Sequence, residues 1–385
     1  MINTRKIDPS ILYQVKTENF NFDRMECLVY SSNYQKTKRY LESMTTCKIF
    51  AEYPFINAFA VNACPNSIGM LSSIKHIKYI TSEAKVFAQV NIAKKVMNLE
   101  KLTQEGFDGS GVTIAFIDTG IASHIDFLMP NNRILVFKDF VGYEKNAYDD
   151  NGHGTFVSSV ACGNGICSGK KYAGIAPNAN IISLKALDKN GETGAFTILE
   201  AMQWIHDNHK KYNIRVVCMS FGSQPLNSGD PLIRGAETLW NDGIVVVVAA
   251  GNSGPETATI KSPGVSTKVI TVGALNDARS EDGKFDEKLF KVADFSSRGP
   301  AFNNFKPDLV ASGVKLTCCS INEKEPYTQM SGTSVATPLI AGLSALIIQK
   351  FPEISPYEVK GLILQNCKKI TGNRNEEGFG YFKID

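Results

Sequence analysis

The stretch "VTIAFID", Val112 to Asp118, is apolar except for Thr113 up to its last residue, and runs of this kind indicate the fold. Three more follow it: "NIISLKAL" (Asn180–Leu187), "IRVVCMSF" (Ile214–Phe221) and "IVVVVAA" (Ile244–Ala250). Two helical stretches, Phe196–Lys211 and Pro231–Gly243, lie between them. Strands that are apolar on both faces need cover on both faces, which is typical of parallel sheets. We therefore predict an α/β fold, with helices on both faces of a mostly parallel sheet.

Composition excludes several classes of protein. The chain has 385 residues, and its net charge of +3 is too small to indicate a nucleic acid or an anionic membrane as partner. Apolar runs such as Gly243–Ala250 are shorter than the about 20 residues that span a bilayer. Residues 1–25 contain no apolar core of a secretory signal, so we expect a cytoplasmic protein. The nine scattered cysteines, with Cys318 and Cys319 adjacent, are expected to be mostly reduced thiols.

The hydrophobic pattern changes near residue 88. Before it, Phe55–Ala63 alternates like a strand, Cys64–Ile74 is typical of a turn and a short helix, and residues 76–87 indicate a second strand. We predict a small α+β domain at residues 1–87 and a large α/β domain at residues 88–385.

Two polar residues, Asp118 and Asn252, are predicted at the carboxyl ends of strands, where functional groups collect in parallel sheets. Asp118 begins the turn "DTGI", and an Asx-turn or a helix cap is an alternative role for it. Asn252 lies in "AAGNSGP", which is also strong turn chemistry. A side-chain amide at this place could instead donate to a developing oxyanion.

Two further residues, His153 and Ser334, are predicted at the starts of helices. His153 stands between glycines in "NGHGTFV", which favours a functional histidine over a structural one. Ser334 lies in "SGTSVATP", where a helix start would supply free N–H groups and partial positive charge. Its alternative role is a plain helix cap. The other histidines are interpreted as surface or structural residues: His76, His124, His206 and His209.

Together, the stretches "AFIDTGI", "NGHGTFV", "AAGNSGP" and "SGTSVATP" closely resemble the subtilisin-like serine proteases. The chain order Asp, His, Ser is that of subtilisin. The resemblance runs from about Ala88 to near the C-terminus. It is strongest to the signal-less intracellular bacterial branch, which shares "YDDNGHGT". The resemblance implies a subtilisin-like fold and a serine endopeptidase, with residues 1–87 as an inhibitor-like propeptide.

The resemblance also implies residue roles. Ser334 would attack the scissile carbonyl, His153 would take its proton, and Asp118 would orient the imidazole. Asn252 would bind the oxyanion together with the Ser334 N–H.

Polypeptide substrate would bind as an extended strand between two segments of the chain. These segments contain Gly194, Ala195, Phe196, Ser220, Phe221 and Gly222. The P1 pocket would be lined by Ala249, Ala250 and Gly251; it shows no evident charge, so bulky apolar P1 side chains are expected. Phe196 and Leu199 would form an apolar P4 pocket.

The propeptide is expected to be cut from the chain near Phe87–Ala88 by the enzyme itself, and to remain a partner of the cleft. The chemistry needs no cofactor. Residues 163–172 do not match the calcium loop of secreted relatives, which argues against a structural calcium ion. Asp126 and Gln89 match calcium-holding positions in those relatives, but without the loop they do not establish a site.

Two departures from the family pattern, Phe156 and Val335, are interpreted as packing changes. The alternative function is a catalytically silent or permanently inhibited relative that serves as a binding or signalling module. The intact triad favours the active enzyme.

Overall fold

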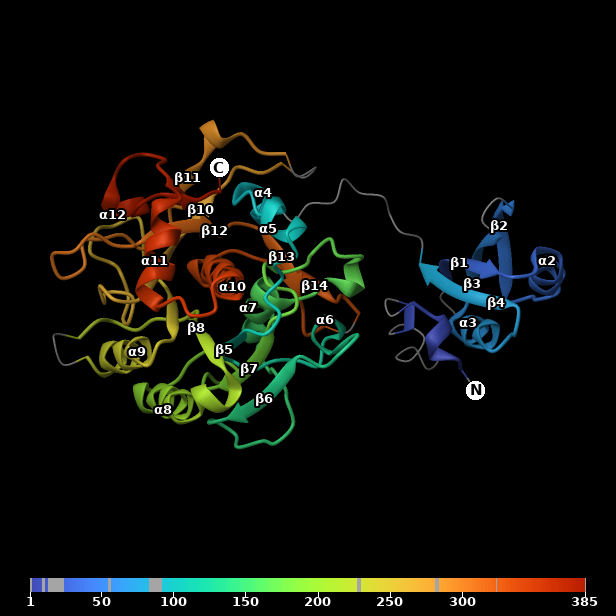
Figure 1. Ribbon diagram of the computed structural model, residues 1–385, viewed down its shortest axis with the longest axis horizontal. Helices are drawn as coiled ribbons and strands as arrows, with labels where there is room; N and C mark the ends of the chain where they lie inside the picture. Colours follow the sequence, from blue (N-terminus) through green and yellow to red (C-terminus); the bar gives the residue numbers. More distant parts are fainter. Residues whose placement is uncertain are drawn as a thin grey trace. The chain divides into compact units, whose positions relative to one another are not determined.

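The computed structural model (Figure 1) describes most of the chain. The described residues are 2–8, 11–12, 24–54, 57–82, 92–226, 230–280, 284–322 and 324–384. They group into two compact units, which are Met1–Gln89 with Ile166–Gly169 and Val90–Gly165 with Lys170–Asp385.

The first unit contains an antiparallel sheet of order β2-β3-β1-β4. Its elements are η1 (Thr4–Lys6), β1 (Met25–Ser31), α2 (Tyr34–Glu42), β2 (Cys47–Tyr53), β3 (Ala58–Ala63), α3 (Pro65–Ser72) and β4 (Ile77–Ser82). Side chains from the sheet and both helices, such as Val29, Phe59 and Leu71, share one buried core. The α+β character agrees with the sequence pattern, while β1, α2 and β2 were not predicted individually.

The second unit contains a ten-stranded sheet whose main path runs β15-β16-β12-β10-β9-β8-β5-β7-β6. Its strands are β5 (Thr113–Asp118), β6 (Ile134–Asp139), β7 (Asn180–Lys185), β8 (Ile214–Met219), β9 (Val245–Ala249), β10 (Ile270–Asn276), β11 (Lys291–Val292), β12 (Leu309–Ser312), β15 (Cys367–Lys368) and β16 (Tyr381–Phe382). Pairing is parallel from β16 through to β6 and antiparallel for β11 and β15. A separate hairpin joins β13 (Leu316–Cys319) to β14 (Tyr327–Met330).

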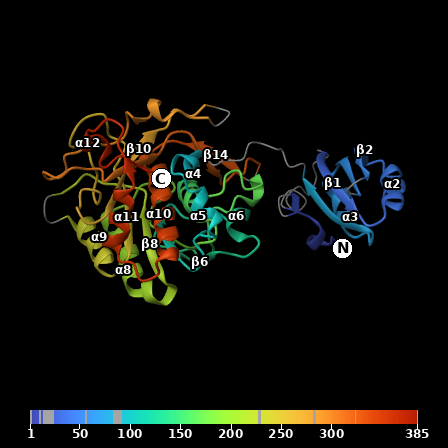
Figure 2. The same ribbon diagram turned by 45° about the horizontal axis from the view of Figure 1, so that its top comes forward.

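Helices cover both faces of this sheet, as the apolar strands require (Figures 1 and 2). The helices are α4 (Ile92–Val96), α5 (Glu100–Gln104), α6 (Ile125–Leu128), α7 (His153–Cys162), α8 (Ala195–Tyr212), α9 (Pro231–Asn241), α10 (Thr333–Lys350), α11 (Pro356–Gln365) and α12 (Arg374–Glu377), with short 3-10 turns η3 (Ile166–Ser168) and η4 (Glu287–Leu289). α7 and α10 pack on each other and on the sheet, while α8 and α9 form a second pair against β8 and β9. Both views place β8 between α10 and α8.

The two helix pairs differ in sequence because they differ in burial. α8 buries Ile198, Ala201, Met202 and Ile205, a spacing that places them on one face of a helix. α10 is buried nearly all round, and it is the one described helix long and apolar enough to cross a membrane. Its burial shows that this apolarity belongs to the centre of the fold.

The α/β fold with a mostly parallel sheet is therefore confirmed. All four predicted strands are present, as β5, β7, β8 and β9, within a few residues of their expected bounds. The strands β6, β10 and β12 were not predicted individually. Their pairing partners come from distant parts of the chain, which the local pattern does not specify.

Replacing Gly342 with alanine should destabilise the fold, because α10 and its neighbours meet there without a side chain between them. A β-carbon on this residue would lie 2.7 Å from Ile175 Cβ. We expect a loss of about 1–3 kcal/mol in the free energy of unfolding, measured by denaturant titration. The control is Gly361→Ala in α11, where no atom lies within 4 Å of the new carbon; its stability should stay equal or rise. Equal stability of both variants would contradict the packing described.

Candidate functional site

Asp118 is the last residue of β5, and its carboxylate is buried, with 2% of the residue exposed. Oδ1 accepts the backbone N–H of Thr119 at 2.8 Å and faces His153 Nδ1 at 2.7 Å. Oδ2 is buried without a donor among the described residues. The negative charge therefore depends mainly on the imidazole for compensation.

His153 is the first residue of α7, so its backbone is fixed by a helix while its side chain remains half-buried. Burial alone would lower the pKa of its imidazole. The charge and hydrogen bond of Asp118, with a smaller contribution from Asp149, outweigh burial and raise the pKa above 6.5. With Nδ1–H donated to Asp118, the lone pair of the neutral ring lies on Nε2.

The start of α7 is held by Asp149, a buried carboxylate that accepts five hydrogen bonds. Three go to Oδ1, from Thr119 Oγ1 (2.9 Å) and the N–H groups of Asn151 (3.1 Å) and Gly152 (2.8 Å). Oδ2 accepts Thr155 N–H at 2.8 Å and Thr155 Oγ1 at 2.7 Å. Burial opposes the charged form, but these bonds lower the pKa of Asp149 and keep it ionised. Asp149 thus ties the β5 turn to the helix that begins with His153.

The β5 turn and α7 approach each other more closely than a side chain allows. A β-carbon on Gly154 would lie 2.3 Å from the Gly120 carbonyl oxygen. Gly154 N–H donates to Thr119 Oγ1 at 2.8 Å. On the other side, the buried Lys185 ammonium donates to Thr119 O at 2.7 Å and to Asp150 at 2.6 Å. The turn that carries Asp118 is therefore fixed from two directions.

Ser334 lies in the first turn of α10, two residues after the N-cap residue Gly332. Its backbone N–H has no acceptor among the described residues, as expected at a helix N-terminus. A β-carbon on Gly332 would lie 3.0 Å from Ser334 Oγ and 3.5 Å from Asn252 Nδ2. Glycine here leaves space beside both polar groups. No hydrogen bond joins Ser334 to His153 among the described residues; such bonds are often long in the absence of substrate.

Asn252 follows β9, and its side-chain amide is oriented by α10. Its Oδ1 accepts Thr333 N–H at 2.9 Å and Thr333 Oγ1 at 3.0 Å. A backbone N–H can only donate, so the atom facing it must be the carbonyl oxygen. The Nδ2 donors therefore point away from Thr333, toward the space beside Gly332 and Ser334.

The predicted substrate-binding residues lie at the ends of β8 and β9 and at the start of α8. Ser220, Phe221 and Gly222 follow β8, while Ala249, Ala250 and Gly251 end β9 and continue past it. Gly194 is the extended N-cap of α8, and Ala195 and Phe196 already belong to the helix. Phe196 is 82% exposed, and Leu199 lies beside Gly235 of α9. The predicted cleavage residues Phe87 and Ala88, and Gln89, lie outside the described residues.

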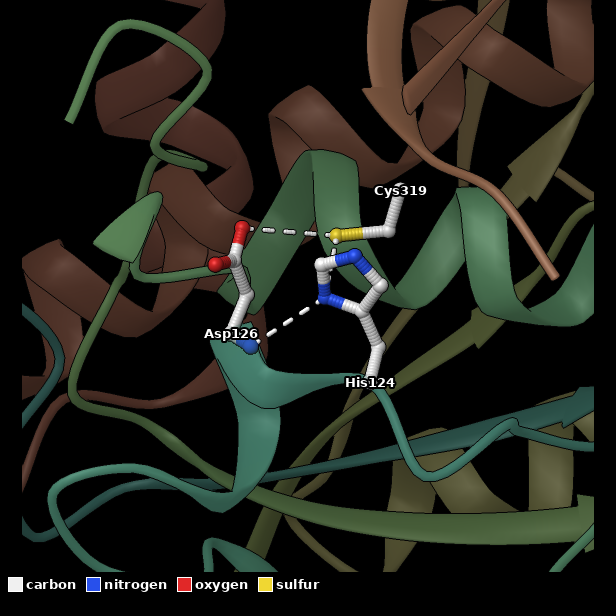
Figure 3. A group of neighbouring side chains, drawn as sticks. All are labelled: His124, Asp126 and Cys319. Carbon is white, nitrogen blue, oxygen red and sulfur yellow. Dashed lines mark hydrogen bonds between the residues drawn. The ribbon is translucent and has the colours of Figure 1, made fainter. Parts of the chain in front are cut away.

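One group among the described residues, His124, Asp126 and Cys319, brings together side chains of metal-binding types (Figure 3). His124 Nε2 lies 3.0 Å from Pro326 O, and its Nδ1 accepts Asp126 N–H at 3.1 Å as the cap of α6. Cys319 Sγ lies 3.2 Å from that Nδ1 and 3.4 Å from Asp126 Oδ2. Burial and the nearby Asp126 charge raise the pKa of Cys319 well above 9.0, so it remains a thiol. These contacts form a structural hydrogen-bond network.

Sequence reasoning named the polar residues at strand ends and helix starts but missed those that hold them. Asp149 lies in the quoted motif "YDDNGHGT", and its spacing to the helix start is a capping signal that could have identified it. Lys185 lies in the predicted strand Asn180–Leu187, and the sequence does not indicate that its buried ammonium group donates to Thr119 O. Phe156 and Val335 are both buried, in agreement with packing roles.

Comparison with known proteins identifies the family of the chain. The model of the subtilase family matches residues 109–381. The chain is 36% identical over 363 residues to the serine protease AprX of Bacillus subtilis (strain 168), covering 88% of this chain and 80% of AprX. It is 32% identical to subtilisin DY of Bacillus licheniformis, covering 75% and 95%. Among solved structures, the S41 psychrophilic protease superposes with a TM-score of 0.64 at 28% identity, covering 78% of this chain and 100% of that one.

The raised pKa of His153 should depend on Asp118. In Asp118→Asn the negative charge that favours the protonated imidazole is lost, while the burial that disfavours it remains. We therefore expect the pKa of His153 to fall below 6.5. Histidine ring protons followed by NMR against pH measure this value. The control is Asp242→Asn, which should lower the pKa of the exposed His206 and leave that of His153 unchanged. An unchanged His153 pKa in Asp118→Asn would refute the coupling.

Proposed function

This chain belongs to the subtilase family of serine endopeptidases, and from that premise we propose that it hydrolyses peptide bonds through Asp118, His153 and Ser334. The observation that carries the proposal is the 2.7 Å contact between Asp118 and His153 at the edge of the sheet where Ser334 and Asn252 also lie. The alternative, a catalytically silent relative that serves as a binding module, gains no support from the site. The carboxylate, imidazole, hydroxyl and side-chain amide that the reaction needs are all present.

The proton path follows from the orientation of the imidazole. Asp118 holds Nδ1–H, so Nε2 is the base that takes the Ser334 hydroxyl proton as Oγ attacks the carbonyl carbon. The C–N bond of the tetrahedral intermediate then breaks, and Nε2–H protonates the leaving amine. Water then attacks the acyl-enzyme in the same way: His153 Nε2 takes a proton from the water and returns it to Ser334 Oγ as the ester bond breaks. The base must be neutral, so activity should rise with pH through the His153 pKa, which Asp118 keeps above 6.5.

The negative oxygen of the intermediate would be stabilised by donors already in place. Asn252 Nδ2 is turned toward the space beside Gly332, because Thr333 holds Oδ1 on the other side. The Ser334 N–H, at the N-terminus of α10, supplies a second donor and the partial positive charge of the helix. Donors fixed before the reaction need no rearrangement in the transition state.

We also propose that residues 1–87 form an inhibitor-like prodomain and that the enzyme cuts its own chain near Phe87–Ala88. An attached segment reaches the cleft at high effective concentration, which favours cleavage at the junction and continued binding afterwards. A cytoplasmic location remains our proposal; the adjacent, buried thiols of Cys318 and Cys319 fit a reducing compartment.

Ser334→Ala should abolish peptide hydrolysis while the protein stays folded. The change removes one oxygen in the first turn of α10, so the loss in stability should not exceed about 1–2 kcal/mol. Hydrolysis of a chromogenic peptide and thermal melting measure the two effects. Ser331→Ala removes an exposed hydroxyl three residues earlier and should retain activity. Hydrolysis by Ser334→Ala at the wild-type rate would refute the assignment.

Autoprocessing should be visible in the mass of the purified chain. We expect wild-type protein cut between residues 80 and 91 and an intact Ser334→Ala chain, because only the former has the nucleophile. Intact-mass spectrometry of both proteins decides the matter. A fully active wild-type chain that remains uncut would end the idea of a zymogen.

A further inference from the structure

Lys261 lies in the segment that connects the two walls of the predicted P1 pocket. Its N–H donates to Ala250 O at 2.9 Å, beside the wall that follows β9. The next residue, Ser262, exchanges two backbone hydrogen bonds with Ser223, at 2.9 and 3.0 Å, beside the wall that follows β8. The backbone of this segment is therefore bonded to both walls.

The side chain of Lys261 occupies the space between the glycines of these walls. A β-carbon on Gly222 would lie 2.5 Å from Lys261 Cβ, and one on Gly251 would lie 2.5 Å from Lys261 Cγ. The open faces of both glycines are thus covered by one lysine stem. The predicted P1 pocket is therefore narrower than a pocket lined by alanine and glycine alone.

The ammonium group of Lys261 has no anionic partner among the described residues. Nζ donates to the neutral Gln224 Oε1 at 3.0 Å, at the solvent-exposed end of the stem. No carboxylate forms an ion pair with it in the described part of the chain. An ammonium has three donors, so two remain for solvent or a ligand.

We propose that Lys261 determines the P1 specificity of this protease and selects substrates with an acidic P1 side chain, glutamate or aspartate. The inference rests on the proposed peptidase function and refines its substrate class. A P1 carboxylate that approaches the walls at Gly222 and Gly251 meets an ammonium group without an anionic partner, and hydrogen bonds between charged groups are stronger than those between neutral groups. A P1 lysine or arginine meets a like charge, and a bulky aromatic side chain meets the lysine stem.

The test is a set of peptides that differ only at P1, with Glu, Gln, Phe or Lys, cleaved by the purified full-length protein. Gln matches Glu in shape and lacks its charge. We expect kcat/KM for Glu to exceed that for Gln about tenfold, as for one hydrogen bond to a charged group. This ratio should fall as salt concentration rises.

Variants assign the preference to the residue. In Lys261→Met the ratio of Glu to Gln should approach one, and in Lys261→Glu the Lys peptide should be cleaved faster than the Gln peptide. The control is Lys268→Met, a lysine bonded to Asn241 outside this pocket, which should keep the wild-type ratio. A ratio near one in the wild type, or an unchanged ratio in Lys261→Met, would overturn the proposal.

Two outcomes separate this inference from the function beneath it. If all four peptides are cleaved at similar rates, the peptidase function stands and the role of Lys261 falls. If none is cleaved, the peptidase function itself fails, and the specificity proposal with it.

The site of self-cleavage provides a second test, since Glu83 is the single acidic residue between positions 80 and 91. An acidic preference replaces the bulky apolar P1 residue expected from the alanine and glycine walls, and it moves the proposed cut from Phe87–Ala88 to the bond after Glu83. A cut after Glu83 supports the proposal, and a cut exclusively after Phe87 counts against it.

Discussion

The carboxylate of Asp149 is the constraint on which the site depends. It accepts bonds from Thr119, which follows Asp118, and from Gly152 and Thr155 on either side of His153 in the sequence. One buried anion thereby fixes the end of β5 against the start of α7. The 2.7 Å contact between Asp118 and His153 follows from that arrangement, because the backbones of both residues are held in place by hydrogen bonds. Precise contacts of this kind need rigid supports rather than mobile loops.

The predicted nucleophile, Ser334, is held by a different kind of support. Ser334 lies in the first turn of α10, a helix that packs on five strands and on α7 and is buried nearly all round. This explains why small and polar residues, 331–334, precede the apolar part of α10. The apolar part fills the core, and the small polar residues place a hydroxyl group and unpaired N–H groups at the edge of the core. Thr333 connects this helix to Asn252, so the predicted nucleophile and oxyanion donor are held by one element.

The sequence predicts well whatever is local. The apolar runs of β5 and β9, and the short motifs around His153 and Ser334, are contiguous and carry their own pattern. It predicts poorly what depends on distant pairing. Lys261 lies between Gly222 and Gly251 only because Ser262 pairs with Ser223, and no feature near Lys261 indicates that contact. The same holds for Gly342, because the side chain nearest to it, Ile175, comes from a distant part of the chain.

The central claim, that this arrangement activates Ser334, is tested most directly by a fluorophosphonate probe, which reacts with serines made nucleophilic by a neighbouring base. The labelled residue is identified by mass spectrometry in the wild-type protein and in His153→Ala. The account predicts one adduct, on Ser334, in the wild type and none in His153→Ala, which has lost the base. An unlabelled wild-type protein, or equal labelling of both proteins, would contradict it.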